Sequence, residues 1–356
     1  MKIRLAILET DQGYLNRIIS VFNTKYSDKL EIYSFTELSA ACSVLNSEKI
    51  DVFIANDSFE MNLSDIPKRC GFAYFVDLAG VDAVKGQKAI CKFQKAELIY
   101  KQILSIYSEK AEDYLGIKQG GKGADCILFH SPGGGTGASS MAAACAIYFA
   151  SKQKKVLYLN LETFGSADSF FTAEGRFDIS DVIYALKTKK ANLILKLESC
   201  VRQSPQGVNF YSKAKIALDM LELKSEEASR LIVELNASGL YDYIIIDGDF
   251  RIDRDYLQVY RQMQSVIWVS DGSEISNEKT RRAYQALSVM EKNLDVSLTG
   301  RIAFMYNKFS NKTGKTMEDI DVKNIGGAPK YEHLSSAQVI ARLSVMDMFE
   351  KLMQQG

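Results

Sequence analysis

The pattern of apolar and polar positions in the first hundred or so residues predicts short strands that alternate with helices. Each predicted strand is a mainly apolar run, and each predicted helix has apolar residues at three- to four-residue spacing. The predicted strands are 2–8, 30–35, 51–55, 72–77 and 88–91. The predicted helices are 14–22, 38–45 and 96–107. This alternation predicts an α/β domain with a five-stranded parallel sheet and helices on both faces.

The rest of the chain repeats the alternation, which predicts a second, mainly parallel sheet. Its predicted strands are 127–129, 155–160, 208–211, 241–247, 264–269 and 301–306. Its predicted helices are 141–150, 225–235 and 276–290. Between the two parts, 108–125 is charged and then glycine-rich, a composition typical of a linker. We therefore expect domains at 1–115 and 125–356, joined by a linker at 116–124.

The segment SPGGGTGASS at 131–140 lies between a predicted strand and an alanine-rich predicted helix. Consecutive glycines allow backbone N–H groups to converge on an anion, and a helix N-terminus adds partial positive charge there. The segment therefore predicts a phosphate cradle. The common P-loop, G-x-x-x-x-G-K-[ST], is not met, because Pro132 and Ala138 stand where Gly and Lys are required. A glycine-rich turn that binds nothing is the alternative for the loop alone.

The loop resembles the deviant P-loop of the MinD/ParA ATPases, K-G-G-x-G-K-[ST]-[ST], except that Gly133 and Ala138 replace both lysines. The resemblance implies that ATP with Mg²⁺ is the cofactor and that Ser139 ligates the magnesium. The loss of two cations that neutralise charge on the β- and γ-phosphates is expected to reduce hydrolysis much more than binding. The predicted nucleotide-binding residues of the loop are Gly133, Gly134, Gly135, Thr136, Gly137, Ala138, Ser139 and Ser140.

Two further strand ends carry residues that this resemblance assigns to the nucleotide site. The run YDYIIID ends in Asp247, the usual Walker B arrangement, in which the carboxylate lies close to magnesium through water. The last predicted strand is followed by Asn307 and Lys308, and in MinD/ParA proteins an Asn at this place reads the adenine edge with its amide donor and acceptor. We therefore expect Ser139 and Asp247 at the metal, and Asn307 with Lys308 at the nucleotide. Taken alone, a solvated Asp and a turn Asn are the alternatives.

The predicted catalytic acids follow the strand at 155–160. MinD/ParA proteins have D-x-D at this place, where the acids position magnesium and the attacking water. Here the pair is Asn160 and Glu162, with a later acid at Asp168. Glu162 and Asp168 are therefore the predicted catalytic residues, and the loss of one carboxylate predicts inefficient activation of water.

The first domain resembles the receiver domain of response regulators in the polar residues at its strand ends. Such a domain has an acidic pair after strand one, a phosphoacceptor Asp after strand three, a Ser or Thr after strand four and Lys-Pro after strand five. The corresponding residues here are Glu9 with Asp11, Asn56, Asp77, and Lys92 with Phe93, and Asp57 stands one residue late. Because Asn cannot accept a phosphoryl group, the resemblance implies a flavodoxin-like, receiver-like module for protein docking. An unrelated flavodoxin-like domain is the alternative.

Composition narrows the classes of function. Lys plus Arg and Asp plus Glu number 44 each, so no net charge favours nucleic acid or an anionic membrane. The six cysteines lack metal-binding spacing, which is typical of reduced residues in a cytosolic protein. We expect no signal peptide and no transmembrane run. The amphipathic stretch 335–353 lacks a basic face, so we expect it to dock as a final helix.

A receiver-like domain ahead of a MinD/ParA-like domain with an altered loop resembles the TadZ/CpaE proteins of tad (Flp) pilus loci. The resemblance implies a cytoplasmic factor, polar or membrane-associated through partners, that binds pilus and secretion assembly proteins through its receiver-like domain. We expect a nucleotide-gated, ATP-dependent homodimer with at most slow ATP hydrolysis, without nucleic acid and without a membrane span. Three alternatives stay open: an active MinD/ParA-type positioning ATPase, a nucleotide-independent interaction module, and a phosphorelay protein that uses Asp57.

Overall fold

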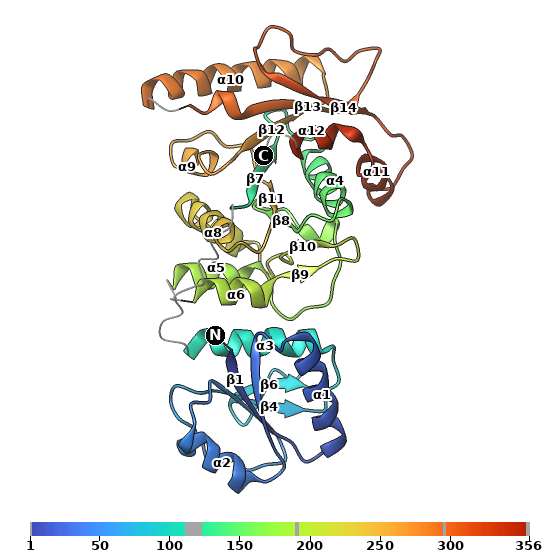
Figure 1. The fold of residues 1–356 in the computed structure, drawn as a ribbon. Helices are drawn as coiled ribbons and strands as arrows, with labels where there is room; N and C mark the ends of the chain where they lie inside the picture. Colours follow the sequence, from blue (N-terminus) through green and yellow to red (C-terminus); the bar gives the residue numbers. More distant parts are fainter. Residues whose placement is uncertain (1, 111–122, 189–191, 295–296, 354–356) are drawn as a thin grey trace. The chain divides into compact units, whose positions relative to one another are not determined.

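A computed structural model of the chain describes residues 2–110, 123–188, 192–294 and 297–353. Contacts between Cα atoms divide the chain into two compact units, Met1–Gly116 with Thr188–Cys200, and Ile117–Lys187 with Val201–Gly356. Each unit is built on its own sheet (Figure 1), which confirms the predicted α/β class with two domains. The predicted linker, 116–124, lies mostly outside the described residues.

The sheet of the first unit has the strand order β2-β1-β3-β4-β6-β5, and over the described residues only β5 pairs antiparallel. Its strands are β1 (Ile3–Leu8), β2 (Leu30–Phe35), β3 (Val52–Asn56), β4 (Gly71–Val76), β5 (Ala83–Val84) and β6 (Gln87–Cys91). Its helices are α1 (Gln12–Lys25), α2 (Leu38–Ser47) and α3 (Ala96–Lys110), with a 3₁₀ turn at Leu63–Asp65. The sheet has one strand more than predicted, because β5 is too short to show an apolar period.

Both faces of this sheet are buried. Ile3, Leu5 and Ile7 of β1 share a core with α1 and α3, whereas Ala6 and Leu8 share a core with α2. Successive side chains of a strand point to opposite faces, so one apolar run supplies both cores. This is the burial that a parallel sheet requires.

Helix α6 (Leu193–Cys200) belongs to the first unit although its sequence lies inside the predicted domain 125–356. Leu195 is buried in the core that contains α1 and α3, and Lys196 Nζ donates to Ser105 Oγ at 3.1 Å. A boundary that the chain crosses more than once leaves no signal in composition, so the sequence pattern could not assign this helix.

The described strands of the second unit form an eight-stranded sheet in the order β14-β13-β12-β7-β11-β8-β10-β9, parallel except for β9. The strands are β7 (Asp125–His130), β8 (Val156–Asn160), β9 (Arg202–Gln203), β10 (Val208–Phe210), β11 (Tyr243–Asp247), β12 (Ser265–Ser270), β13 (Ile302–Phe309) and β14 (Lys323–Pro329). Strand β14 was not predicted, because its sequence KNIGGAP contains two glycines and a proline. Since β7, β8, β11 and β13 end at one edge, the residues that follow them gather there.

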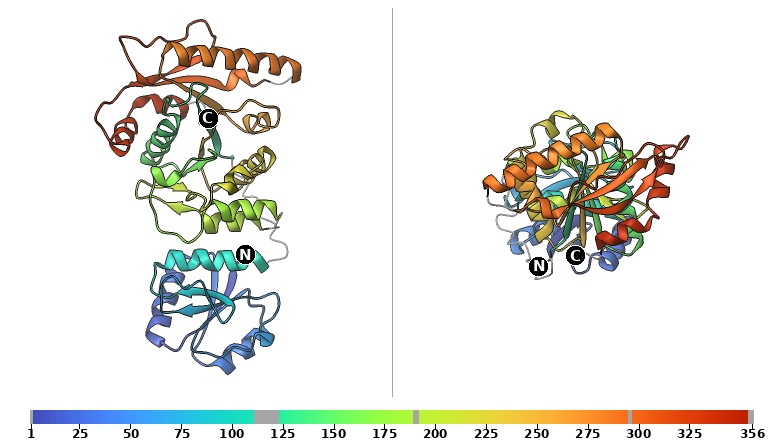
Figure 2. Two further views of the ribbon diagram at one scale, coloured as in Figure 1. Left: turned by 180° about the vertical axis from the view of Figure 1, so that it is seen from behind. Right: turned by 90° about the horizontal axis from the view of Figure 1, so that it is seen from above.

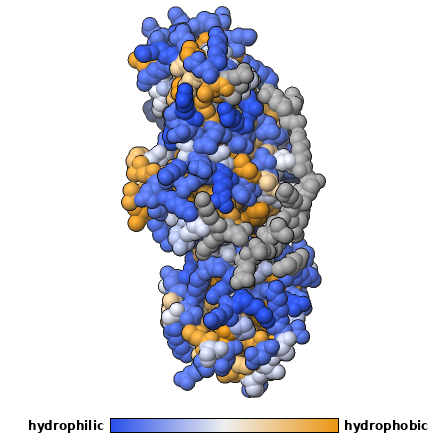
Figure 3. Space-filling view, turned by 90° about the vertical axis from the view of Figure 1, so that its left-hand side faces the viewer, coloured by the Kyte–Doolittle hydropathy of each residue, from blue (hydrophilic) through white to orange (hydrophobic). Residues whose placement is uncertain are grey.

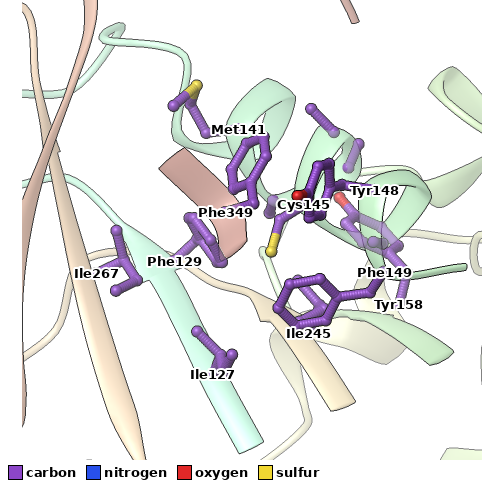
Figure 4. Close-up of a cluster of buried hydrophobic side chains, with 14 of the residues drawn as sticks. Ile127, Phe129, Met141, Cys145, Tyr148, Phe149, Tyr158, Ile245, Ile267 and Phe349 are labelled. Atoms are coloured by element: carbon purple, nitrogen blue, oxygen red, sulfur yellow. The ribbon is translucent and has the colours of Figure 1, made fainter. Parts of the chain in front are cut away.

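Helix α4 (Ala138–Ser151), which follows the glycine loop, is buried on nearly every side. Its segment MAAACA at 141–146 has no exposed surface. Figure 4 shows Phe129 of β7 and Ile245 of β11 in the same cluster as this helix, with Phe349 of the C-terminal segment beside it. A helix that is apolar all round is a core helix, so its packing fixes the position of the end of the glycine loop that precedes it.

The remaining helices surround the second sheet. They are α5 (Ile179–Lys187), α7 (Leu218–Leu221), α8 (Ser225–Ala237), α9 (Leu257–Tyr260), α10 (Glu274–Leu294), α11 (Ser336–Leu343) and α12 (Glu350–Met353), with 3₁₀ turns at Ala167–Ser169, Thr299–Arg301 and Asp347–Phe349. Figures 1 and 2 show α10 beside the end of the sheet that contains β13 and β14. The predicted final helix, 335–353, is divided into α11, a turn and α12, and its buried residues pack in the core around α4.

Polar residues cover most of the visible surface. The face drawn in Figure 3 is mainly hydrophilic, with hydrophobic residues in small groups. Among the helices that the structure describes, none has the length and apolar character needed to cross a membrane. The six cysteines all lie among the described residues and form no disulfide, and four of them are buried.

Candidate nucleotide site

The glycine loop adopts a backbone shape that requires glycine. The angle φ is +68° at Gly134, +64° at Gly135 and +85° at Gly137, the left-handed region that side chains disfavour. Helix α4 then begins at Ala138. The first N–H groups of a helix lack intrahelical partners, so they are available to an anion at the loop.

Residues at the end of β13 hold this loop. Asn307 is buried and donates from Nδ2 to the carbonyl oxygen of Thr136 at 2.8 Å, and Lys308 Nζ donates to the carbonyl oxygen of Gly135 at 2.8 Å. A Cβ at Gly137 would lie 2.5 Å from Asn307 Nδ2, so glycine makes room for the amide. The structure therefore brings both of these predicted nucleotide residues against the loop.

Helix α10 contacts the same loop at Gly133. Lys279 Nζ donates to the carbonyl oxygen of Gly133 at 3.3 Å, and a Cβ at Gly133 would lie 2.5 Å from Ser276 Oγ. Ser276 is itself held by a hydrogen bond of 3.1 Å between its Oγ and Ser270 Oγ. Sequence reasoning missed Lys279 and Ser276, because Lys279 is 146 positions from Gly133 and no motif includes either residue.

The carboxyl ends of β8 and β11 place two acids beside Ser139. Asp247 is the register partner of Asn160, so both side chains lie at the same edge. Asn160 Nδ2 donates to Asp247 Oδ2 at 3.1 Å and to Glu162 Oε2 at 3.3 Å. Ser139 Oγ donates to Glu162 Oε1 at 3.2 Å. Three predicted site residues, Ser139, Glu162 and Asp247, thus belong to one hydrogen-bonded cluster.

Asp247 occupies an unfavourable place for a negative charge. Burial raises the pKa of Asp247 well above its usual range, and the charge of Glu162 raises it further, while the hydroxyls of Tyr158 and Ser139 act in the opposite direction. Tyr158 OH donates to Asp247 Oδ2 at 2.6 Å. Over the described residues, Asp247 Oδ1 has no hydrogen-bond partner. A cation at this oxygen would relieve both the repulsion and the unmet hydrogen-bonding capacity.

The donors of this cluster fit magnesium. Carboxylate and hydroxyl oxygens are the ligands of Mg²⁺, which usually keeps waters and binds phosphate oxygens as well. No three His, Cys, Asp or Glu side chains within the described ranges could hold a metal ion by themselves. Ser139, Glu162 and Asp247 therefore suit a magnesium ion that is shared with a phosphate, and not a metal cage made of protein alone.

Asp168 takes no part in this cluster. Ser212 Oγ donates to its two carboxylate oxygens at 2.8 and 3.0 Å, and the backbone N–H of Lys213 donates to one of them at 2.6 Å. A different acid, Asp249, accepts from both the backbone N–H and the hydroxyl of Thr163, at 2.8 and 2.7 Å. This contact, which sequence reasoning missed, ties the segment after β11 to the segment after β8.

The receiver-like unit contains a closed ionic cluster at the edge of its own sheet. Lys92 Nζ lies 2.7 Å from Asp77 Oδ1 and 3.4 Å from Glu9 Oε2. Asn56, at the phosphoacceptor position, donates from Nδ2 to Glu9 Oε1 at 2.8 Å. Burial lowers the pKa of Lys92, but the hydrogen bond to Asp77 and the charge of Glu9 outweigh it and the net pKa is raised. Asp57 is exposed and its side chain is not part of the cluster.

Asp11, the second member of the predicted acidic pair, serves as a helix cap. Its Oδ1 accepts from the backbone N–H of Tyr14 at 2.9 Å at the start of α1. This hydrogen bond lowers the pKa of Asp11. The carboxylate is thus committed to the helix N-terminus.

His130, the last residue of β7 before the glycine loop, is a buried neutral side chain. Its Nε2 lies 3.0 Å from Tyr260 OH, and its ring packs against Phe250 and Trp268. Burial lowers the pKa of His130 to about 3. The unfolded chain therefore binds a proton at this residue at a higher pH than the folded protein does.

We expect the free energy of unfolding to fall with acid below the ordinary His pKa of 6.5. The contribution of His130 is at most about 1.4 kcal/mol per pH unit between pH 6.5 and pH 3, and it is absent above this window. Urea unfolding followed by the fluorescence of Trp268, the single tryptophan of the chain, measures it. His130→Gln should reduce this slope, whereas the exposed His333→Gln should leave it unchanged; equal slopes for wild type and His130→Gln would contradict the assignment.

Comparison with known proteins distinguishes the two units. The family model of the TadZ-like receiver domain matches residues 1–108. A search of curated proteins finds no match. Among solved structures, the ParA family ATPase from Chlorobium tepidum TLS is similar, with a TM-score of 0.51 and 21% identity over 66% of this chain and 98% of that chain.

Two further solved structures are also similar. MinD from Pyrococcus horikoshii OT3, determined as a complex with Mg-ADP, has a TM-score of 0.49 and 17% identity over 65% of this chain and 99% of that chain. MinD in the MinC:MinD complex from Aquifex aeolicus has a TM-score of 0.47 and 18% identity over 65% of this chain and 97% of that chain. The likeness to the Chlorobium protein shows that the second unit has the fold of a ParA-type P-loop protein.

Proposed function

We propose that this chain is an ATP-Mg-binding, dimeric scaffold for tad (Flp) pilus assembly. A TadZ-like receiver domain at residues 1–108 precedes a domain of the ParA fold, an arrangement of the TadZ/CpaE type. Nucleotide binding gates the dimer, and hydrolysis is slow. The observation that carries the proposal is the cluster of Ser139, Glu162 and Asp247 beside the glycine loop, with an unpartnered carboxylate oxygen among the described residues.

Different residues of the site have different roles in nucleotide binding. The backbone N–H groups of the loop and of the first turn of α4 bind phosphate. Ser139 and Asp247 hold magnesium, and Asn307 with Lys308 holds the loop in place through the carbonyl oxygens of Thr136 and Gly135. Magnesium, when bound, supplies positive charge that offsets the phosphates and the two acids. The name of the similar Chlorobium protein, a ParA family ATPase, supports ATP as the nucleotide.

Slow hydrolysis follows from what the site lacks. The loop 131–140 contains no lysine, so no cation of the loop offsets charge that develops on the phosphates during transfer. Asn160 stands in place of an acid, and Asp168 is engaged with Ser212 and Lys213. Glu162 alone remains to orient a water, which supports low activity in place of efficient turnover.

Exposed apolar side chains near the site support dimerisation. Phe164, two residues after Glu162, is 78% exposed, and Ile275, immediately before Ser276, is 72% exposed. Large exposed apolar side chains are a common feature of protein interfaces. A second copy that covered them would lie against the nucleotide, so nucleotide binding and dimerisation would be coupled.

The receiver-like unit is proposed to dock pilus or secretion assembly proteins. Leu78 and Phe93 are exposed, and they directly follow Asp77 and Lys92 of the closed ionic cluster. A cluster that is already neutralised, rimmed by apolar side chains, suits protein contact better than phosphoryl transfer. Cytoplasmic location, with placement at a cell pole or at the membrane through partners, is part of the proposal and is supported by the family resemblance alone.

Light scattering on a sizing column tests the gated dimer. In ATP-Mg we expect a mass of twice the 39.8 kDa of the chain, and without nucleotide, or with ATP and a chelator, the mass of one chain. Phe164→Ser should weaken the ATP-Mg dimer, because it removes an exposed apolar side chain beside the site. Steady-state phosphate release in the same samples should be slow.

Leu78→Ser is the matched control, since it removes a similarly exposed apolar side chain from the receiver-like unit and should leave the dimer intact. A mass that does not respond to ATP-Mg would contradict the gated dimer and favour the nucleotide-independent interaction module. Rapid hydrolysis would instead favour the active MinD/ParA-type positioning ATPase.

A further inference from the structure

We propose that Lys279 of α10 supplies the phosphate-binding positive charge that the glycine loop lacks at position 133. The inference deepens the proposed ATP-Mg binding and rests on it. It concerns a residue outside the loop and outside every motif of the sequence. Its ligand is the phosphate chain of a nucleoside triphosphate.

The space beside Gly133 is already filled by α10. A Cβ at Gly133 would lie 2.5 Å from Ser276 Oγ and 3.3 Å from Ser276 Cβ, so a side chain at this position would require Ser276 to rotate and to shift. Ser276 and Lys279 are three residues apart and lie on one face of the helix. The same face of α10 thus excludes a side chain at Gly133 and presents an ammonium group to the same residue.

Lys279 is held only weakly where it is. Its Nζ donates to the neutral carbonyl oxygen of Gly133 at 3.3 Å, and the side chain is exposed. A hydrogen bond between two charged groups, such as ammonium and phosphate, is shorter and stronger than one to a neutral carbonyl. A phosphate bound at the loop would therefore draw the ammonium group away from the carbonyl.

The acids around Lys279 do not neutralise it. In the part of the chain that the structure describes, no carboxylate lies within ion-pair distance of its Nζ. The neighbouring Glu278 accepts from Arg281 at 2.7 Å, and Arg281 also pairs with Asp319 at 2.6 Å. Lys279 also lines a cavity of about 770 Å³ together with Glu274, Glu278 and Lys315, and no residue of the glycine loop lines this cavity. Its charge is thus available to a ligand.

Lys308 also contacts the loop but has a different role. Its Nζ is bonded to Gly135 at the shorter distance of 2.8 Å, and its backbone is left-handed, with φ of +57°. Such a backbone is costly outside glycine and persists where the surroundings hold it. The preceding Asn307 is buried and bonded to the loop as well. We therefore treat Lys308 as a positioning residue that keeps Gly135 in place.

The two roles predict different responses to the number of phosphates. For Lys279→Met, we expect affinity for ATP-Mg to fall roughly tenfold or more, and affinity for ADP-Mg to fall less, because a terminal phosphate contact is lost. For Lys308→Met, ATP-Mg and ADP-Mg should weaken by similar factors, because the loop itself loosens. Titration calorimetry of the full chain with each nucleotide measures both ratios.

Lys315→Met is the matched control for Lys279→Met, because it removes the same charge from the same cavity without touching the loop. Lys279→Arg should retain most of the ATP affinity. Equal effects of Lys279→Met and Lys315→Met, or equal losses for ATP and ADP in Lys279→Met, would overturn the assignment. A wild-type chain that failed to bind ATP-Mg would instead contradict the proposed function itself.

Restoring the missing lysine gives a second, steric test. Gly133→Lys in the Lys279→Met background should not recover ATP affinity, and it should lower the melting temperature, because Ser276 occupies the space that the new side chain needs. Recovery of wild-type affinity by Gly133→Lys would show that α10 moves to make room for the new side chain, and it would overturn the steric part of the inference.

Discussion

Asp247→Asn is expected to weaken magnesium-dependent ATP binding on the order of 100-fold while leaving the nucleotide-free protein at least as stable as wild type. In the nucleotide-free protein the buried Asp247 carboxylate is opposed by burial and by the charge of Glu162, which together raise its pKa. An amide removes that repulsion and can still accept from Tyr158 OH, the donor at 2.6 Å. It does not, however, provide the negative charge with which a carboxylate attracts magnesium.

Thermal unfolding with and without ATP-Mg, followed by Trp268 fluorescence, separates these effects, because bound ligand stabilises the folded state by an amount that rises with the logarithm of its affinity. Asp168→Asn is the matched control. It should lower stability, since it weakens hydrogen bonds from Ser212 and Lys213, but it should keep the stabilisation by ATP-Mg. If Asp247→Asn were stabilised by ATP-Mg as strongly as wild type, Asp247 would not belong to the metal site.

Lys92→Met is expected to destabilise the receiver-like unit by about 3 kcal/mol, because it leaves a buried carboxylate without its cation. The side chains of Lys92 and Glu9 are 7% and 0% exposed, and their charged atoms lie 3.4 Å apart. Asn56 still donates to Glu9 in the variant, but an amide does not neutralise the charge. The lost positive charge, and not the lost packing of the Lys92 side chain, should therefore account for the loss of stability of the receiver-like unit.

Hydrogen exchange in β1 and β6 of the full chain measures this loss, and Trp268 fluorescence shows that the second unit is unaffected. Lys88→Met is the matched control, because the pair of Lys88 with Glu109 is exposed and should contribute less than about 1 kcal/mol. Adding Glu9→Gln to Lys92→Met should recover most of the stability. Exchange rates in Lys92→Met equal to those in Lys88→Met would contradict a buried ion pair.

The sequence pattern predicted the strands that are apolar runs of several residues and missed the very short strands and the glycine-rich strand. Strands such as β1 and β11 are almost wholly apolar, so hydrophobic pattern alone identifies them. Strand β5 has two residues and β14 contains glycine and proline, and their pairing is imposed by neighbouring strands. Helix α6 packs in the core of the first unit although the expected domain 125–356 includes its sequence, because α3, the helix beside it, is far away along the chain.

The candidate site was predictable where a residue follows a strand end. Asp247 is the last residue of β11, Asn307 lies near the end of β13 and Glu162 follows β8 by two residues, and the carboxyl ends of parallel strands meet at one edge. Tyr158 had a weaker signal: it lies two residues before Asn160, on the same face of β8, and so it could have been expected near Asp247. Lys279 had no signal in the sequence, because it lies on a helix 146 positions from Gly133 and outside every motif.

By itself, the sequence determined the two α/β units, the glycine loop without a lysine and the acids at strand ends. These features are properties of short segments and of their order along the chain. Tertiary structure alone decided that Asp168 lies outside the acid cluster, that Ser276 fills the space beside Gly133, and that Lys279 contacts the loop. The physical reason is that these facts depend on distances between segments far apart in the chain, which packing sets and local pattern does not encode.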